Sequence, residues 1–538
     1  MEERIEKNPV VSLLLLCVGL YFFNLNLLQV SIMEARNFIV AREMLSDGNW
    51  LLTTMNGIPR YEKPPFPIWF TLPFIAIPGS NTLFWFRIPT SVFATFGVLL
   101  MYFFMIRLTG VKRLGLFAAM ILGTTLYYLT IRYEGPSDTY THVSMFGAIL
   151  ALFLFLTRPD PTPWLAIAAG LLTGISFLSK GPVSLYAMLL PFLIAFVLVY
   201  GIPKFRKKIT GLVLYMMISL MTGMSWFLYV RLADPGNFLA IASRETANWS
   251  SYNVKPFYFY WNFFVHSGIW AIPTLAGMLM YKWMKKVSPW FQLYKFSLLW
   301  MLFSVLLLSL VPEKKVRYLM PVMFPLAIHA AIWMATFIRF AVQDTTKLFT
   351  WLKYLALGLP AITAFLFPAA GVLLDIEGSR EWTIFLIGSF LFVSTGVSLL
   401  RMLARNRLVT AFYLVISLFL LVMMVGFRAV NWVPVNEDYR SPENFLNKEN
   451  LRLFAFKEIQ PEIIWELGLM VPVVDEDFIF KQNKPLLLIV PKNQEEDFLK
   501  IRNHKNEIEK IDTFNRNYFR KKNNRYKARY IMDIYRVE

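Results

Sequence analysis

Residues 31–70 read SIMEARNFIVAREMLSDGNWLLTTMNGIPRYEKPPFPIWF and form a polar segment between two strongly apolar stretches. The charged side chains in it include Glu34, Arg36, Arg42, Glu43, Glu62 and Lys63. Charge held beside a bilayer is costly and therefore usually functional. The segment predicts an active site at a membrane–water boundary, with the apolar stretches on either side crossing the bilayer.

The composition of the whole chain is that of a polytopic membrane protein. Of its 538 residues, 57% are hydrophobic and 17% are charged, whereas soluble domains have about a quarter charged residues. A net charge of +19 would suggest nucleic-acid binding in a soluble protein. Here the excess lies largely in short loops, as membrane topology requires, so we expect no nucleic-acid partner. The single cysteine, Cys17, excludes an internal disulfide.

The hydropathy pattern predicts an all-α membrane domain with about thirteen transmembrane helices. The expected spans are 9–30, 83–106, 114–131, 142–157, 164–178, 183–202, 210–230, 258–281, 296–312, 318–338, 350–374, 382–400 and 409–427. The first is too long for a cleaved signal peptide and reads as a membrane helix. With a cytoplasmic N-terminus, the Lys and Arg clusters fall in the inner loops. The inner clusters are Arg107, Lys112 and Arg113; Arg158; Lys204, Arg206, Lys207 and Lys208; Lys282, Lys285 and Lys286; Arg339 and Lys347; Arg401, Arg405 and Arg407.

An odd number of spans places the polar C-terminal tail outside the cytoplasm. We therefore predict a transmembrane domain of residues 1–430, with outer-face loops at 31–82 and 231–257, followed by a small extracytoplasmic α/β domain of residues 431–538. Short apolar runs at 451–456, 484–490 and 530–537 predict strands. Residues 460–469 and 493–511 are expected to be helical.

One outer loop, PEKKVRY at residues 312–318, carries three cations where topology discourages them. Lys314, Lys315 and Arg317 suit a phosphate, since Arg can bind two oxygens and Lys acts as a point charge. The alternative is that these side chains snorkel to the phosphates of membrane lipids.

The opening loop also allows two interpretations. Ser31 and Glu34 fit a capping box and Gly48 fits a helix stop, which predicts a surface helix over 32–46 with Glu34 as a cap. Arg36 then either lies in solvent or binds a ligand.

Glu62 and Lys63 precede Pro64-Pro65, whose stiff extended backbone presents the acid–base pair rigidly at the interface. A plain surface ion pair is the alternative.

Three further outer loops contribute charges. Glu134 and Asp138 follow the third span, and Asp138 is either functional or the N-cap of the fourth span. Lys180 ends the fifth span, and Lys255 precedes the aromatic run PFYFYWNFF. These carboxylates and cations are predicted to share one face, where they suit a lipid phosphate as leaving group and an incoming nucleophile.

Cofactors are not indicated by the sequence. The four histidines, His142, His266, His329 and His504, have no metal-ligand spacing. Carboxylates alone could hold a divalent ion, so metal use is left open, although we assign no metal ligand.

At this point the sequence resembles a known family. The run MEARNFIVAREMLSDGNWLLTTMNGIPRYEKPPFPIWF, together with SDTYTHVSMFGAI at 137–149, FLSKGPVS at 177–184, KPFYFYWNFF at 255–264 and EKKVRYLMP at 313–321, resembles bacterial membrane glycosyltransferases that use polyprenyl-phosphate sugars. These ArnT-like enzymes of the GT-C class include the aminoarabinose transferases of lipid A and are grouped with the protein O-mannosyltransferases. The resemblance covers roughly residues 9–430.

The resemblance implies a multi-pass enzyme of the bacterial inner membrane with a periplasmic C-terminal domain. It would transfer a sugar from undecaprenyl phosphate to an extracytoplasmic acceptor, such as lipid A or another envelope glycolipid or glycan. By position, Lys63 and Tyr318 would hold the donor phosphate with help from Lys255, and Glu62 and Asp138 would line the reaction centre. Lys180 would approach the donor or acceptor phosphate. Membrane lipids are further partners, and we expect a monomer.

One departure from the family bears on the acceptor. The family usually has adjacent acids in the first loop, where this chain has Met33-Glu34. Either Glu34 takes over the missing acid's work or the acceptor needs no strong base, as an ionised phosphate would not.

The alternatives in function are a protein O-glycosyltransferase and, from another class, a lipid or solute transporter. Transporters typically place polar groups near the midplane of the membrane, whereas here they cluster at one surface. A structural scaffold for envelope assembly is a third alternative.

Overall fold

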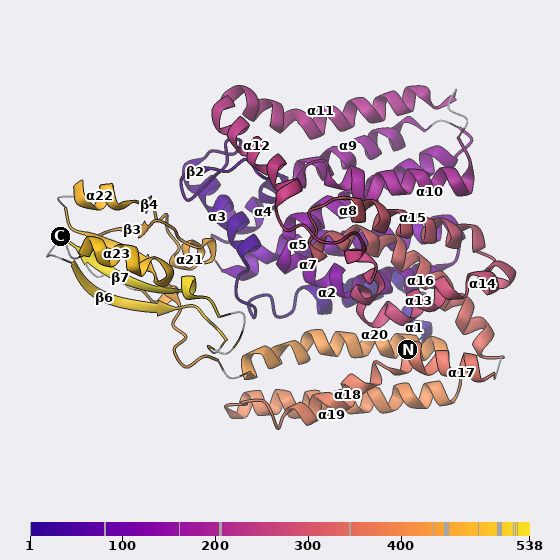
Figure 1. Cartoon of the computed structure of the whole chain (residues 1–538). Helices are drawn as coiled ribbons and strands as arrows, with labels where there is room; N and C mark the ends of the chain where they lie inside the picture. The colour runs from indigo at the N-terminus through magenta and orange to yellow at the C-terminus, as the bar shows by residue number, and fades with distance from the viewer. Residues whose placement is uncertain are drawn as a thin grey trace. The chain divides into compact units, whose positions relative to one another are not determined.

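The computed structural model has two compact units. The helical unit comprises Met1–Leu28 and Tyr61–Trp432, and the sheet unit comprises Gln29–Arg60 and Val433–Glu538 (Figure 1). The described residues are 2–79, 82–160, 162–203, 207–343, 346–433, 435–445, 451–481, 484–502, 508–519, 521, 523 and 526–538. Lys204, Arg206 and His504 lie outside them.

The helical unit is built from apolar helices joined by short turns. Its first half contains α1 (Glu2–Lys7), α2 (Pro9–Tyr21), α4 (Phe66–Ala76), α5 (Leu83–Thr109), α6 (Lys112–Thr124), α7 (Leu126–Glu134), α8 (Pro136–Thr157), α9 (Pro163–Lys180), the π-helix η1 (Leu185–Leu189) and α10 (Leu190–Tyr200). Its second half contains α11 (Ile209–Ala233), α12 (Pro235–Ser251), η3 (Phe257–Tyr260), η4 (Phe263–Trp270), α13 (Ala271–Leu279), α14 (Tyr281–Val287), α15 (Phe291–Leu310), η5 (Val316–Leu319), α16 (Met320–Ala341), α17 (Lys347–Lys353), η6 (Tyr354–Gly358), α18 (Ala361–Ala370), α19 (Ser379–Ala404), α20 (Leu408–Met424) and η7 (Gly426–Trp432).

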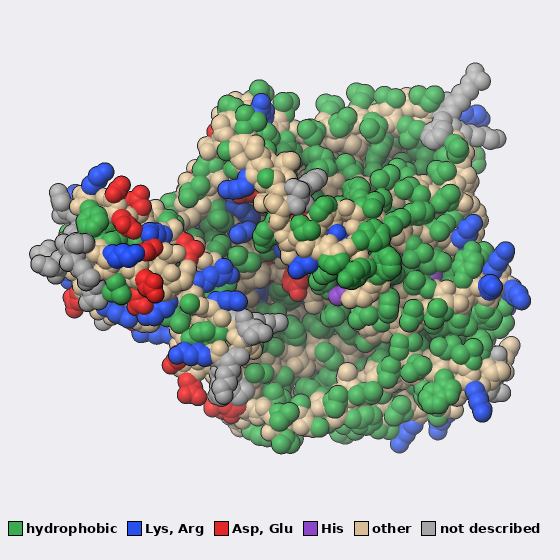
Figure 2. Space-filling model, in the orientation of Figure 1, with side chains coloured by type: hydrophobic (Ala, Val, Ile, Leu, Met, Phe, Trp, Pro, Cys, Tyr) green, Lys and Arg blue, Asp and Glu red, His purple; other side chains and the backbone are tan. Residues whose placement is uncertain are grey.

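The apolar helices are those of a multi-pass membrane protein. Within the described residues, eight helices are long and apolar enough to span a bilayer, or up to 11 if each of three bent pairs is one span. Each predicted span falls on one of these helices or pairs, except 9–30 and 183–202, which fall on the shorter helices Pro9–Tyr21 and Leu185–Tyr200. The count of thirteen therefore stays a prediction. Hydrophobic side chains cover most of the visible surface of this unit, as lipid exposure requires (Figure 2).

Small residues let the helices approach closely. Helix α9 packs against both α8 and α11 (Figure 1). A Cβ at Gly174 would meet the Cβ of Thr222 on α11 at 2.4 Å, and one at Gly170 would meet the backbone oxygen of Tyr215 at 3.0 Å. Such contacts between small residues stabilise helix pairs in lipid, where apolar burial contributes little.

The structure adds detail to two of the predicted outer loops and decides one alternative that the sequence left open. The fourth helix begins at Pro136 rather than 142, and its N-cap is Gly135, so Asp138 lies in the first turn and is not the cap. The stretch 231–257 is mostly a helix, α12, and its N-cap Asp234 accepts a hydrogen bond from the backbone of Asn237. Both helices begin with proline at the first helical position, which α8 uses without a side-chain cap and α12 uses after the Asp234 cap.

The sheet unit begins with the predicted surface helix. Helix α3 (Ile32–Asp47) has the expected capping box between Ser31 and Glu34 and the expected left-handed Gly48 at its C-cap, with φ of 68°. It leads to the short hairpin β1 (Thr54–Met55) and β2 (Ile58–Pro59). Glu43 of α3 holds this turn by accepting hydrogen bonds from the Asn56 backbone at 2.6 Å and the Thr54 hydroxyl at 2.7 Å.

Most of the sheet unit comes from the C-terminal tail. Its elements are η8 (Pro442–Asn444), β3 (Arg452–Phe456), α21 (Pro461–Leu467), β4 (Val473–Val474), α22 (Glu476–Lys481), β5 (Leu486–Pro491), η9 (Lys492–Gln494), α23 (Glu495–Arg502), β6 (Ile508–Asn515), η10 (Ala528–Tyr530) and β7 (Ile531–Val537). The sheet order is β4-β3-β5-β7-β6, parallel among the first three strands and antiparallel thereafter.

The tail contains the three predicted strands, but the predicted helix 493–511 is partly wrong. It ends at Arg502, and residues from Ile508 pair with β7 instead. Pairing with a neighbouring strand outweighed the local helical preference of this charged segment. The division expected at residues 430 and 431 also differs from the units, because Gln29–Arg60 groups with the tail. The side chain of Asn56 donates to the Val471 carbonyl oxygen at 2.6 Å and accepts from its N–H at 2.7 Å.

We expect Gly174→Ala to lower the thermal unfolding temperature in detergent, because the new methyl group overlaps Thr222 on α11. Overpacking of this kind costs about 1–3 kcal/mol. Gly236→Ala is the matched control, since no atom lies within 4 Å of its added Cβ. Equal unfolding temperatures for the two variants would contradict the close approach of α9 and α11.

Candidate active site

A buried ion pair forms the centre of the candidate site. Asp138, in the first turn of α8, accepts a hydrogen bond from the ammonium of Lys180, the last residue of α9. Their side chains are 3% and 6% exposed. Gly181, with φ of 79°, ends α9 in a conformation that suits glycine, so the chain turns immediately after Lys180. His142 lies one turn along α8, with its Nε2 3.6 Å from the same Asp138 oxygen.

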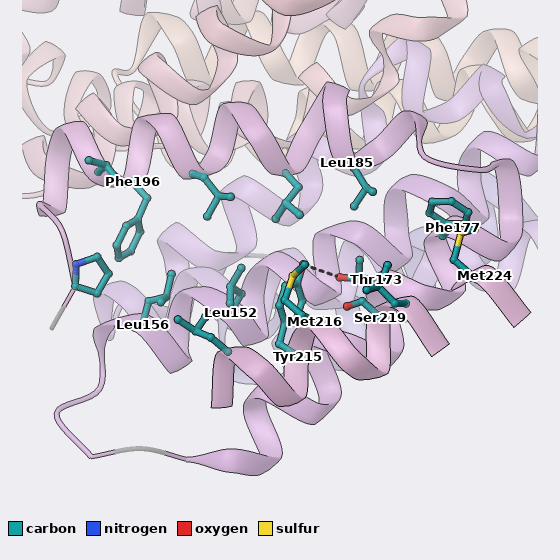
Figure 3. A pocket seen from close by; sticks show the side chains of 16 residues that line it. Leu152, Leu156, Thr173, Phe177, Leu185, Phe196, Tyr215, Met216, Ser219 and Met224 are labelled. Atoms are coloured by element: carbon teal, nitrogen blue, oxygen red, sulfur yellow. Dashed lines mark hydrogen bonds between the residues drawn. The ribbon is translucent and has the colours of Figure 1, made fainter. Parts of the chain in front are cut away.

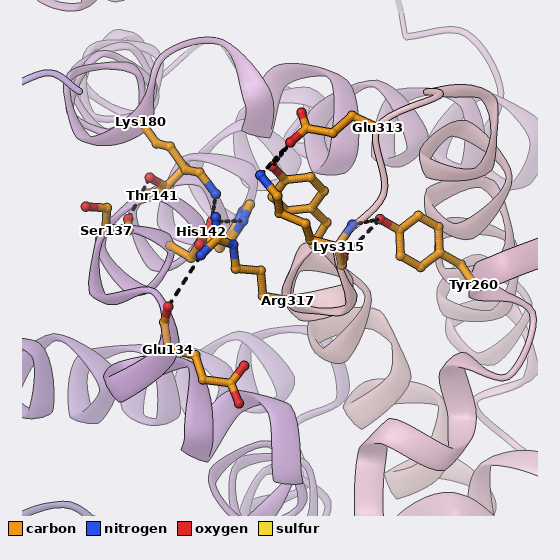
Figure 4. Close-up of polar contacts among 11 residues, drawn as sticks. Glu134, Ser137, Thr141, His142, Lys180, Tyr260, Glu313, Lys315 and Arg317 are labelled. Carbon is orange, nitrogen blue, oxygen red and sulfur yellow. Dashed lines mark hydrogen bonds and ion pairs between the residues drawn. The ribbon is translucent and has the colours of Figure 1, made fainter. Parts of the chain in front are cut away.

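Tyr318 forms one wall of the site, at the start of η5 and α16. The Lys180 ammonium lies 4.9 Å from the centre of its ring, and the Lys315 ammonium lies 5.7 Å from the same centre. The phenol oxygen lies 3.2 Å from Glu313, whose same oxygen accepts from Lys315 at 2.5 Å. Two cations thus lie near one aromatic ring, and Glu313 pairs with one of them, Lys315 (Figure 4).

The loop that carries these cations is held by a second outer segment. Val254 and Glu313 form an isolated antiparallel bridge. The Asn253 side chain donates to the Lys314 carbonyl oxygen at 2.8 Å, and the Tyr260 hydroxyl contacts the backbone of Lys315 at 3.0 Å. These contacts with the loop backbone fix the position from which the Lys315 side chain extends; the contact between Tyr260 and Lys315 is drawn in Figure 4.

Lys314 behaves differently from its neighbours. Its side chain is buried, and its ammonium donates to the backbone oxygens of Val311 at 2.5 Å and Lys255 at 3.1 Å. Burial lowers the pKa of this ammonium. The predicted phosphate-binding role of Lys314 stays a prediction, but its contacts are those of a group that holds the loop together.

The Lys255 side chain is exposed, and the backbone N–H of Lys255 donates to the Pro312 carbonyl oxygen at 3.3 Å.

Lys63 reaches the site from the segment before α4. It is close enough to Lys180 to act on it electrostatically, as is Arg317. The residues before it are tied to α12 and its cap: the Tyr61 hydroxyl lies 2.8 Å from Asp234, and Glu62 accepts from Arg244 at 2.5 Å. The predicted site residues Lys63, Asp138, Lys180, Lys315, Arg317 and Tyr318 therefore all belong to the helical unit.

Glu34 and Arg36 belong to the sheet unit. Glu34 is 1% exposed, and its carboxylate accepts from the Ser31 backbone at 3.0 Å as part of the capping box. The backbone oxygen of Arg36 accepts from Arg60 at 2.9 Å. Their predicted roles in the site stay predictions.

Several buried polar atoms around the ion pair have no hydrogen-bond partner among the described residues. They are Thr139 Oγ1, His142 Nδ1, Arg317 Nε and Glu62 Oε2. Unpaired buried polar groups are costly, and a polar ligand can supply the missing partners. The described residues contain no group of three or more His, Cys, Asp or Glu side chains placed to hold a metal ion.

An apolar cavity of about 640 Å³ lies between α8, α9, η1, α10 and α11 (Figure 3). Leu152, Leu185 and Met216 are among the side chains that line it, and the polar groups of Thr173, Tyr215 and Ser219 face each other on one side. Phe177, at one end of the cavity, precedes Lys180 on α9 by three residues, a rise of about 4.5 Å. The lining of the cavity therefore comes within about one helical turn of Lys180 along α9.

Four residues that contact the predicted site residues were given no role in the site from the sequence. These are His142, Asp234, Arg244 and Glu313. Spacing along the sequence does not reveal most of these contacts. Arg244, for example, is 182 residues from its partner Glu62. Only His142, four residues from Asp138, stands at a spacing that places both on one helix face.

Comparison with known proteins shows which class of enzymes this chain resembles. Residues 62–226 match the family model described as dolichyl-phosphate-mannose-protein mannosyltransferase. An undecaprenyl phosphate-alpha-4-amino-4-deoxy-L-arabinose arabinosyl transferase of Pseudomonas fluorescens is 28% identical over 347 residues, 62% of this chain and 57% of that protein. An uncharacterized protein of Aquifex aeolicus is 28% identical over 372 residues, 66% of this chain and 70% of its own.

The fold is similar to that of a solved structure. ArnT from Cupriavidus metallidurans, bound to undecaprenyl phosphate, matches with a TM-score of 0.70 at 14% identity, covering 99% of this chain and 98% of its own. By sequence and fold, then, the chain is similar to the ArnT-like membrane glycosyltransferases, which confirms the resemblance predicted above. It spans less than two thirds of the length of the named arabinosyl transferase of Pseudomonas fluorescens.

We expect Lys180→Met to destabilise the protein, because it leaves the Asp138 carboxylate buried without its cation. Breaking a buried ion pair from one side costs about 3–5 kcal/mol, whereas replacing both partners is often neutral. The double variant Asp138→Asn/Lys180→Met should therefore recover most of the lost unfolding temperature. If the double variant unfolds as readily as the single one, the pair is not the source of the effect.

Proposed function

We propose that the protein transfers a sugar from undecaprenyl phosphate to a lipid acceptor on the outer side of the bacterial inner membrane, with lipid A as the leading candidate. The observation that supports this most is the gathering of Lys63, Lys180, Lys315 and Tyr318 around the buried Asp138 at the ends of apolar helices. Cations at this level suit a phosphate whose lipid tail stays in the bilayer.

In the proposed reaction, an acceptor oxygen attacks the anomeric carbon of the sugar in a single displacement. The bond from that carbon to the phosphate oxygen breaks, and its electron pair stays on the departing lipid phosphate. Lys63, Lys180 and Lys315 stabilise the negative charge that builds there, which is often the largest catalytic contribution. Asp138 keeps Lys180 oriented toward the phosphate. An ionised acceptor phosphate needs no strong base.

We also propose the topology on which this chemistry depends. The thirteen predicted spans place the N-terminus in the cytoplasm, and the loops around Lys63, Lys180 and Tyr318 on the outer side. The tail, with its five-stranded sheet, then forms a periplasmic α/β domain. The relatives named as undecaprenyl phosphate-alpha-4-amino-4-deoxy-L-arabinose arabinosyl transferases support an undecaprenyl-phosphate-linked sugar as the donor.

The function is tested with purified protein, an undecaprenyl-phosphate-linked aminoarabinose and lipid A, with mass spectrometry of the products. We expect transfer to lipid A, and a loss of roughly 10²-fold or more in turnover for Lys63→Ala, since one charge-stabilising group is worth about that much. Lys282→Ala, an exposed cation on α14, is the control. Transfer to Ser or Thr of a peptide instead would favour the protein O-glycosyltransferase, and no transfer at all would favour the transporter.

The apolar cavity is proposed to hold a hydrocarbon chain of one of the two lipid substrates. Leu185→Trp partly fills the cavity and should raise KM roughly tenfold for the substrate whose chain enters it. KM measured separately for donor and lipid A identifies that substrate. The control is Leu198→Trp, on the same helical segment but 55% exposed and outside the lining. Unchanged KM for both substrates would exclude the cavity as a chain site.

A further inference from the structure

One outer segment contacts both sides of the candidate phosphate site. We name residues 234–255 the strap; they comprise the cap of α12, α12 itself and the turn that follows. One part of the strap contacts the residues directly before Lys63, and its end contacts the loop directly before Tyr318.

The first contact joins the start of the strap to Tyr61. Asp234 accepts from the Tyr61 hydroxyl at 2.8 Å and also from the Asn237 side chain at 3.0 Å. Hydrogen bonds from Asn237 and Tyr61 lower the pKa of the Asp234 carboxyl, and burial raises the pKa of Tyr61. At neutral pH the carboxylate is therefore charged and Tyr61 is the donor. The Tyr61 ring packs on Trp226 of α11, with centroids 6.3 Å apart.

The second contact joins the middle of α12 to Glu62. Arg244 donates to Glu62 at 2.5 Å. Arg244 is 62% exposed and Glu62 is 23% exposed, so the pair contributes little to overall stability. Its effect is local. Residues 60–65 form neither helix nor strand, and side-chain contacts must fix what backbone pairing does not.

The far end of the strap fixes the other half of the site. The Lys315 ammonium lies 4.9 Å from the centre of the Tyr252 ring. Asn253 donates to the Lys314 oxygen, and Val254 bridges Glu313. The loop that places Lys315 and Tyr318 is thereby built on the strap.

We propose that the strap sets the spacing between Lys63 and the loop of residues 313–318, and that Asp234 and Arg244 are positioning residues for Lys63 in binding the donor phosphate. The inference rests on the proposed function and names a specific determinant of donor affinity. A phosphate bound between cations on two segments is sensitive to their separation, since a displacement near 1 Å can cost about 10²-fold in rate. Glu62 then acts by orienting Lys63 and need not touch the donor.

The first test uses Arg244→Gln in the full-length protein in lipid nanodiscs, with undecaprenyl phosphate as the binding probe. We expect affinity to fall roughly tenfold, equivalent to about 1.4 kcal/mol, with KM for the donor rising more than kcat falls. Arg244→Lys, which keeps the charge, should restore part of the affinity. Arg107→Gln removes an exposed arginine at the end of α5, outside the strap, and is the matched control. Unchanged affinity in Arg244→Gln overturns the proposal.

A double-mutant cycle tests the other contact. Tyr61→Phe and Asp234→Ala each remove the same hydrogen bond, so the double variant should bind undecaprenyl phosphate no more weakly than Asp234→Ala alone. Additive losses would overturn the assignment of Asp234 as acting through Tyr61. Asp234→Asn retains both the cap and an acceptor, and should stay near wild type.

Hydrogen exchange separates this inference from the proposed function. In Arg244→Gln, amides in 60–63 and 236–248 should exchange faster in the absence of undecaprenyl phosphate, because the contact between the two segments is lost. If wild-type protein fails to bind undecaprenyl phosphate while this exchange change is seen, the proposed function fails and the contact stands. If exchange is unchanged, the strap does not hold Lys63 in place, whatever the protein binds.

Discussion

The Asp138–Lys180 ion pair is the interaction around which the outer end of the helical unit is arranged. A charge at the end of a membrane helix is costly unless it is paired, and here each charge removes the cost of the other. The pair joins the first turn of α8 to the last turn of α9. Lys63, from the segment before α4, and Lys315 and Tyr318, from the segment between α15 and α16, lie near this pair.

The site gathers several cations within a small region. Asp138 pairs with Lys180, Glu313 pairs with Lys315, and Lys63 and Arg317 lie close enough to Lys180 to act on it electrostatically. Lysine and arginine side chains gathered in a partly buried site suit an anion with several oxygens. A phospholipid-like ligand also needs a place for its hydrocarbon chain. The apolar cavity, whose lining comes within about one helical turn of Lys180 along α9, could hold that chain.

Not every charged side chain in the outer loops contributes in the same way. Lys314 resembles its neighbour Lys315 in sequence, yet its ammonium is directed to backbone oxygens inside the loop. Glu62 was assigned to the reaction centre by resemblance, yet it is paired with Arg244. Asp234 and Glu313 carry out structural work that the candidate ligands depend on. The chemistry of the site is thus shared between groups that face the ligand and groups that hold them.

The sequence by itself determined the membrane class, because long apolar helices must satisfy their backbone groups internally and leave a hydropathy signal. It also determined the capped helix α3, whose cap is local in the chain, and most of the residues that gather around Asp138. The starts of α8 and α12 carry a local proline signal that the hydropathy pattern does not include, whereas β6 depends on pairing with β7 and could not be determined from its own residues. The pairing of Arg244 with Glu62 and the burial of Lys314 were decided only by the tertiary structure, because side-chain direction in a loop is set by neighbours remote in sequence.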